Sequence, residues 1–201
     1  MLIITGPGRS GTSLLAQFCK DLGFDPGGEW YDGVNAGLEY PVVVRINDAI
    51  LKEAHKSGKT VEALKQYSET MRSLPNLVVK DPRFSYHPAV MEAWSSVRQD
   101  LTVLLTYRKP EHSIASRKRL ARALFVGFNK RSPDKVRIEF ANTIETLLRL
   151  NIRFKCILFP HFLKQYDEVM DTFAYLGLDF DESIARAKWD GLVNPDRVHF
   201  K

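Results

Sequence analysis

The segment from Ile3 to Leu15 constrains this chain more than any other, because it runs from an apolar strand through a glycine-rich loop into a helix start. The spacing of the phosphate-loop pattern G-x-x-x-x-G-K-(S/T) is matched by Gly6, Gly11 and Ser13. Thr12 stands where nucleotide triphosphatases carry lysine, and a cation occurs earlier, as Arg9. The segment therefore predicts a phosphate site, with a ligand other than the usual nucleoside triphosphate.

Length and composition favour one domain over residues 1–201. With 201 residues, 44% of them hydrophobic, the chain can bury one substantial core, and it has no Pro/Gly/Ser-rich linker. A secretory leader and an apolar run of roughly 18 residues are both missing, so we expect a cytoplasmic protein that contacts no membrane. Cys19 and Cys156 fall in a predicted helix and a predicted buried strand, which favours core residues over a disulfide or a metal site.

Four nearly continuous apolar runs predict parallel strands covered on both faces, at residues 1–5, 77–80, 101–107 and 154–159. Helical patterns occur at residues 12–22, 41–56, 61–71, 111–124, 132–150 and 166–176. Strands that alternate with crossover helices predict an α/β three-layer sandwich, with a central parallel sheet of four to five strands and a phosphate loop after the first strand. Ligands of such sheets bind at the carboxyl ends of the strands.

Two features of the first loop explain how it would hold an anion. Gly8 and Gly11 allow a tight turn, so that the amides from Ser10 to Ser13 can point at phosphate oxygens near the positive end of the helix dipole. Arg9 adds a charged fork. The alternative is an ordinary glycine-rich turn into a helix, and the strand before the loop favours the phosphate site over it.

A second candidate motif follows the third predicted strand. That strand ends at Arg108, and Ser116 lies eight residues later, about two turns into the next helix. The two side chains can converge on one anion. Kinases and triphosphatases usually place an aspartate for magnesium at a strand end near the phosphate loop, so the arginine favours charge neutralisation by side chains, without a metal.

Together the two motifs resemble those of the sulfotransferases, which move a sulfuryl group from 3′-phosphoadenosine 5′-phosphosulfate (PAPS) to an acceptor hydroxyl or amine. The family's first loop, (K/R)-S-G-T-(S/T), grips the 5′ phosphosulfate and matches Arg9-Ser10-Gly11-Thr12-Ser13. Its strand-end arginine and the serine eight residues on hold the 3′ phosphate and match Arg108 and Ser116. The resemblance thus implies PAPS as donor, bound by Gly8, Arg9, Ser10, Gly11, Thr12, Ser13, Arg108 and Ser116.

Two further stretches resemble the bacterial branch of the family. Residues 35–48 resemble its pattern of a glycine, two residues and a glutamate before a helix with R-x-N-D, and residues 77–83 resemble its strand followed by K-D-P-R. The resemblance implies that Lys80 and Arg9 flank the bridging oxygen of the donor, with Glu39 as the general base. The chain departs from the family pattern at Leu14, at His112 and Ser113, and in lacking a G-x-x-G-x-x-K segment, so what covers the adenine stays open.

The identity of the general base also stays open. Glu39 precedes a predicted helix, where a surface glutamate could instead stabilise the helix through its dipole. His87 and His55 are rivals, although a histidine beside Pro88 is also typical of a structural role. Arg83 either orients an acidic or sugar acceptor or forms an ion pair with a nearby carboxylate.

Two other functions compete with sulfuryl transfer. A phosphate-loop kinase using ATP and magnesium would share the fold, but Thr12 and the missing strand-end aspartate count against it. The positive charge of residues 117–122 and 130–137 suggests a nucleic-acid-binding module, for which no recognition helix or aromatic platform is found. We expect a small-molecule or carbohydrate acceptor as the partner. The sequence does not specify the acceptor or the oligomeric state.

Overall fold

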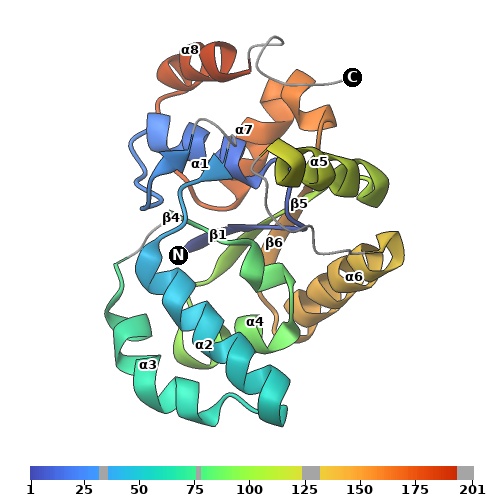
Figure 1. The fold of residues 1–201 in the computed structure, drawn as a ribbon. Helices are drawn as coiled ribbons and strands as arrows, with labels where there is room; N and C mark the ends of the chain where they lie inside the picture. Colours follow the sequence, from blue (N-terminus) through green and yellow to red (C-terminus); the bar gives the residue numbers. More distant parts are fainter. Residues whose placement is uncertain (32–35, 76–77, 124–131, 194–201) are drawn as a thin grey trace.

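A parallel four-stranded sheet lies at the centre of the chain in a computed structural model that describes residues 1–31, 36–75, 78–123 and 132–193 (Figure 1). The strand order is β4-β1-β5-β6, with β1 at Leu2–Thr5, β4 at Val78–Lys80, β5 at Thr102–Tyr107 and β6 at Arg153–Leu158. Ile4 of β1 pairs with Lys80 on one side and with Leu104 on the other. The predicted strands and their parallel arrangement are therefore confirmed.

Helices cover both faces of the sheet, which gives the predicted three layers (Figure 1). One face packs against α1 (Thr12–Asp21), α7 (Tyr166–Tyr175) and α8 (Glu182–Leu192). The other face packs against α2 (Pro41–Ser57), α3 (Val61–Ser73), α4 (Pro88–Val97) and α6 (Pro133–Arg149). α5 (Pro110–Ala123) follows β5, and short 3-10 helices follow β4 and β6, at Pro82–Ser85 and His161–Lys164.

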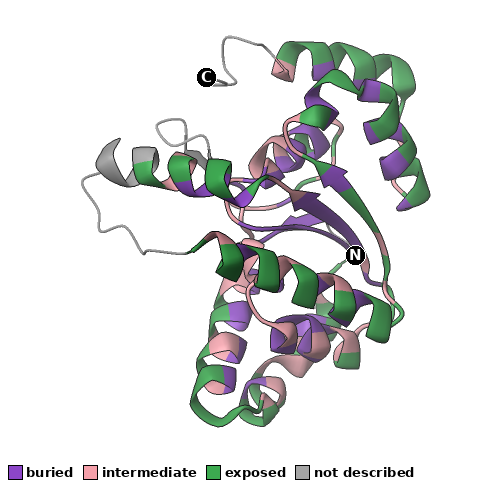
Figure 2. Ribbon diagram, turned by 90° about the vertical axis from the view of Figure 1, so that its right-hand side faces the viewer, coloured by how far each residue is buried: buried purple, intermediate pink, exposed green. Residues whose placement is uncertain are grey.

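Alternating side chains of the inner strands supply the two cores. Ile3 of β1 enters the core on the α2 side, whereas Leu2 and Ile4 enter the core on the α1 side. Figure 2 shows the strands as a mostly buried centre and the outer faces of the helices as exposed. This double coverage explains why the strands read as continuous apolar runs.

One prediction about the sheet is wrong. β6 pairs with β5 alone among the described strands, and Ile157 is its one fully buried residue. Cys156 was expected in a buried strand and is instead exposed, while Cys19 on α1 is buried as expected. Burial of the Cys19 side chain raises the pKa of its thiol well above the ordinary value.

The six predicted helices are present, and their described ends are shifted by two residues at most; residue 124, the expected end of the fourth, lies outside the described residues. Ser132 caps α6 as expected, since its Oγ accepts a hydrogen bond of 3.1 Å from the Lys135 amide. Sequence patterns missed α4, because it is apolar on most sides, and α8, whose buried stripe consists of Ala185 and Trp189. They also missed a two-stranded hairpin of β2 (Trp30–Tyr31) and β3 (Ala36–Gly37).

Among the described residues, no helix combines the length and apolar character that a bilayer crossing would require.

Candidate functional site

The loop between β1 and α1 has the backbone geometry of an anion site. Arg9 and Gly11 have left-handed φ values of 71° and 94°, and Ser10 between them does not have a positive φ. Such alternation turns successive N–H groups toward one side, where they can bind an anion. The first turn of α1 begins directly after Gly11, whose carbonyl accepts hydrogen bonds from the amides of Leu14 and Leu15. The positive end of the α1 dipole therefore reinforces the loop.

Close packing fixes this loop against the neighbouring strands. A Cβ on Gly6 would lie 2.2 Å from the Thr106 carbonyl oxygen, and a Cβ on Gly11 would lie 2.5 Å from Cδ2 of Phe159. The buried hydroxyl of Ser10 is 2.6 Å from that of Thr106, which ties the loop to the end of β5. Only glycine fits at these two positions, because a side chain would collide with the neighbouring atoms and because the backbone of both residues has a positive φ.

The predicted arginine and serine of the second motif lie against this loop. Arg108 donates from Nη1 to the Arg9 carbonyl oxygen at 3.2 Å, and Arg9 donates from Nε to Ser116 Oγ, also at 3.2 Å. The Arg108 guanidinium lies over the ring of Phe159, with 5.0 Å between Cζ and the ring centre. The structure thus brings Arg9, Arg108 and Ser116 together, although they come from segments about 100 residues apart.

Lys80 and Glu39, the other predicted catalytic residues, are in direct contact. Lys80 ends β4 with 3% of its surface exposed, and its Nζ donates to the Gly37 carbonyl at 3.1 Å and to Glu39 Oε1 at 2.7 Å. A bend at Gly37 and Leu38, with φ values of 126° and 60°, brings Glu39 to this position before α2 begins. The Arg9 side chain bonds Ser116 on the β5 side of β1, whereas Lys80 ends β4 on the other side.

Arg83 joins three carboxylates at the amino-terminal half of α2. Its guanidinium donates to Asp48 Oδ1 at 2.6 Å and to Glu39 Oε2 and Asp81 Oδ1, both at 3.1 Å. Burial opposes its charge, but the carboxylates of Asp81 and Asp48 outweigh burial and raise the pKa of Arg83. Arg83 therefore has the ion-pair role, the second of the two alternatives drawn from the sequence, and it also holds Glu39.

Sequence reasoning missed two residues whose hydrogen bonds connect the segments around Arg83. Asp81 is fully buried, and its Oδ2 accepts a hydrogen bond of 2.9 Å from Asn47 Nδ2. Asn47 Oδ1 accepts in turn from Trp94 Nε1 at 2.7 Å, so β4, α2 and α4 are joined by one buried polar chain. Burial raises the pKa of Asp81, and the Arg83 charge partly offsets that rise. The only sequence signal for these residues was their place in the R-x-N-D and K-D-P-R stretches.

The rival bases His55 and His87 lie elsewhere, with ring centres 5.5 Å apart. Both border a cavity of about 480 Å³ between α2, the start of α4 and the start of α6. His87 Nδ1 accepts a hydrogen bond of 3.2 Å from the Ala89 amide and thereby caps α4. His55 Nδ1 lies 2.7 Å from the Leu51 carbonyl of its own helix. The capping bond gives His87 the structural role that its position beside Pro88 also allowed.

Stability is expected to fall in acid through His87. Burial and the nearby His55 lower the pKa of His87 from its ordinary value of 6.5, against a smaller opposing effect of Glu92. The unfolded chain therefore takes up the proton more readily, so the free energy of unfolding is greatest above pH 6.5 and decreases as the pH falls below it. His87→Asn keeps a capping side chain that does not titrate, and should show a smaller decrease in urea unfolding between pH 7.5 and about 5.5. Equal decreases in both proteins would contradict the assignment.

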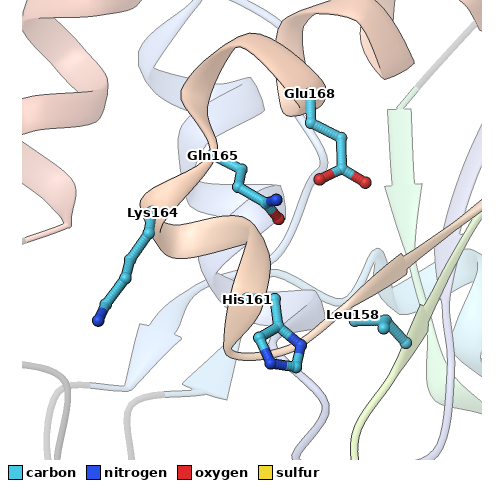
Figure 3. A pocket seen from close by; sticks show the side chains of 5 residues that line it. All are labelled: Leu158, His161, Lys164, Gln165 and Glu168. Carbon is cyan, nitrogen blue, oxygen red and sulfur yellow. The ribbon is translucent and has the colours of Figure 1, made fainter.

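A separate hollow of about 400 Å³ lies beyond the end of β6 and is lined by Leu158, His161, Lys164, Gln165 and Glu168. In Figure 3 the side chains of Gln165 and Glu168 extend toward the same space, and Lys164 extends away from them. The lining combines one carboxylate, one amide, one imidazole and the Lys164 ammonium, whereas the loop after β1 lies beside the guanidinium of Arg108. Among residues 1–31, 36–75, 78–123 and 132–193, no group of three or more His, Cys, Asp or Glu side chains is arranged to hold a metal ion.

Comparison with known proteins identifies the fold. No protein-family model matches the sequence, and no curated protein matches it significantly. The sulfotransferase domain of the Synechococcus PCC 7002 olefin synthase superposes with a TM-score of 0.55 at 14% identity, over 100% of this chain and 82% of that domain. The sulfotransferase domain of the curacin biosynthetic pathway gives 0.51 at 16% identity, over 100% and 80%. A sulfotransferase from Alicyclobacillus acidocaldarius gives 0.54 at 14% identity, over 96% and 94%.

This chain therefore has the fold of the sulfotransferase domains. The likeness extends over nearly the whole chain in all three comparisons. The resemblance drawn from the sequence motifs is confirmed at the level of the fold. Sequence identities of 14% to 16% establish a shared fold and not a shared activity.

Proposed function

We propose that this protein is a PAPS-dependent sulfotransferase that acts on a hydroxyl or amine acceptor. The observation that carries the proposal is the meeting of the two predicted donor motifs at one sheet edge. Arg9 of the glycine loop contacts both Arg108 and Ser116, each at 3.2 Å. A loop that presents backbone amides beside an arginine–serine pair suits a nucleotide with phosphates at two positions. The shared fold of sulfotransferase domains supports the same function.

In the proposed complex the donor lies across the carboxyl ends of β1 and β5. The amides from Ser10 to Ser13 and the amino terminus of α1 bind the 5′ phosphosulfate. Arg108 and Ser116 hold the 3′ phosphate, and for this the bond between Arg9 and Ser116 has to open. Arginine where kinases carry a magnesium-binding aspartate supports charge neutralisation by side chains.

The proposed reaction is an in-line transfer. The acceptor oxygen forms a bond to sulfur while the bond from sulfur to the 5′ phosphate oxygen breaks, and Glu39 accepts the acceptor's proton. Negative charge then builds on the departing 3′,5′-bisphosphate, where Lys80 and Arg9 stabilise it. The contact of Lys80 with Glu39, at 2.7 Å, supports a common site for the cation and the base. We further propose one domain over residues 1–201 and a cytoplasmic location.

Thermal unfolding with three ligands tests the donor. Adenosine 3′,5′-bisphosphate is expected to raise the melting temperature, because a ligand at 100 times its Kd adds about 2.7 kcal/mol to the stability of the folded state. ATP with magnesium, and a short oligonucleotide at two salt concentrations, should raise it much less. Stabilisation by ATP and magnesium but not by the bisphosphate would contradict the proposal and favour a kinase. Strong, salt-dependent stabilisation by the oligonucleotide alone would favour nucleic-acid binding.

A further inference from the structure

Arg117 makes a contact with the phosphate loop that neither the sequence motifs nor the comparisons assign. It follows Ser116 on α5 and donates from Nε and Nη2 to the carbonyl oxygen of Gly8, at 3.3 and 3.2 Å. The guanidinium occupies the space that a side chain on Gly8 would need, since a Cβ there would lie 2.8 Å from Nη2. Gly8 and Arg117 are thus fitted to each other across 109 residues of sequence.

Two consecutive carbonyls of the loop are held in this way. Arg117 holds the carbonyl of Gly8, and Arg108 holds that of Arg9 with a bond of 3.2 Å. In a trans peptide the C=O and the following N–H point in opposite directions. Arginines that hold these two carbonyls therefore turn the amides of Arg9 and Ser10 away from themselves, toward the opposite side of the loop.

The backbone conformation of the loop requires such support. Arg9 has a φ of 71°, a left-handed value that is unfavourable for a residue with a side chain and persists only where the surroundings enforce it. Together with Gly11, at 94°, it gives the alternation that turns successive amides toward an anion. The hydrogen bonds from Arg117 and Arg108 supply that support on the two peptides that flank Arg9, Gly8–Arg9 and Arg9–Ser10.

We propose that Arg117 is a positioning residue, which holds the loop in its anion-binding shape before the donor arrives. The proposal deepens the proposed function and rests on it for the identity of the anion. Arg117 acts through the Gly8 carbonyl, so its removal should loosen the loop in the ligand-free protein as well as weaken binding. A residue that only contacted the donor phosphate would leave the ligand-free loop unchanged.

Calorimetric titration with adenosine 3′,5′-bisphosphate measures the effect on binding. Arg117→Ala is expected to weaken binding about 10-fold to 100-fold, since two charge-assisted hydrogen bonds to the loop are lost. Arg117→Lys can still donate to the Gly8 carbonyl and should recover part of the affinity. Lys118→Ala, which removes one exposed charge from the next position of α5, is the control and should change the Kd less than threefold. Equal effects of Arg117→Ala and Lys118→Ala would overturn the proposal.

Amide signals of the ligand-free protein separate positioning from direct contact. In Arg117→Ala the NMR signals of Arg9 and Ser10 should shift, and their hydrogen exchange should accelerate, at an unchanged melting temperature. Unchanged signals with weakened binding would mean that Arg117 contacts the donor directly, and would overturn the positioning role. Gly8→Ala provides a second route, because its methyl group displaces the guanidinium. Its effect and that of Arg117→Ala should be less than additive in the double variant, whereas full additivity would contradict the coupling.

Inorganic pyrophosphate as a second probe distinguishes this proposal from the proposed function. Wild-type protein that binds pyrophosphate but not the bisphosphate would contradict the function as a PAPS enzyme. A weaker pyrophosphate affinity of Arg117→Ala would still support the positioning role. Wild-type protein that binds neither anion would contradict both.

Discussion

Replacement of Lys80 by alanine is expected to lower the turnover of sulfuryl transfer by about 10² or more, with a much smaller effect on donor binding. The reason is that charge on the departing bisphosphate develops only during transfer, so a cation placed there stabilises the transition state more than the ground state. Lys80 is the buried cation nearest to Glu39, at the carboxyl end of β4. An ammonium group held there away from water interacts with that charge more strongly than one in solvent.

The position of the Lys80 ammonium is well fixed, which is why a large effect is expected. Nζ bonds the Gly37 carbonyl and Glu39, and the strand below it is paired with β1 through Ile4. In the proposed reaction the bisphosphate leaving group would therefore meet a cation that does not need to reorganise. Lys80→Met keeps most of the apolar stem and controls for packing, while Lys52→Ala removes an exposed lysine from α2 as a charge control.

Single-turnover rates with PAPS, together with bisphosphate affinity and melting temperature, provide the test. Both Lys80 variants should lose turnover while their folded state persists, since Glu39 keeps its bond to Arg83. Lys52→Ala should behave as the wild type does. If Lys80→Ala keeps wild-type turnover, the lysine does not stabilise the leaving group and the mechanism needs another cation.

The fold could be predicted because its determinants are local in the sequence. Runs such as Thr102–Tyr107 show burial on both faces without reference to any partner, and Gly11 before Thr12 marks where the loop becomes a helix. The order of the strands in the sheet is not determined locally. Whether a strand lies at the centre or at the edge depends on which strands pair with it, so a local pattern could not predict that Cys156 of β6 is exposed.

The same distinction applies to the candidate site. The strand end that the apolar pattern reveals and the spacing after it suggested Arg108 and Ser116, whereas Lys80, the last residue of β4, was suggested by the family resemblance. The residues that hold them in place interact over long separations along the chain. Arg117 contacts Gly8 across 109 residues, and Trp94 contacts Asn47 across 47, and neither pair leaves a periodic trace in the sequence. Their roles follow from tertiary geometry alone.

Glu39→Gln is expected to lower turnover by about 10² to 10⁴ at unchanged donor affinity, because a carboxamide cannot take the acceptor's proton. The structure also offers a competing explanation. Glu39 gives one oxygen to Lys80 and the other to Arg83, so it could act by holding Lys80 rather than as a base. Each carboxylate oxygen has a second lone pair, and with 31% of the side chain exposed an acceptor hydroxyl can reach one of them.

A series of hydroxyl acceptors of increasing acidity decides between these two roles. General-base catalysis contributes less when the acceptor gives up its proton more easily, so a base at Glu39 predicts that the deficit of Glu39→Gln shrinks along a series of substituted phenols. If the loss of turnover in Glu39→Gln is the same for all phenols of the series, Glu39 acts by positioning Lys80. The variant would then have lost stabilisation of the leaving group, which does not depend on the acidity of the acceptor. In that case the double variant should lose little more turnover than Glu39→Gln alone. If the two residues act independently, the fold-losses of turnover of the two single variants should multiply in the double variant.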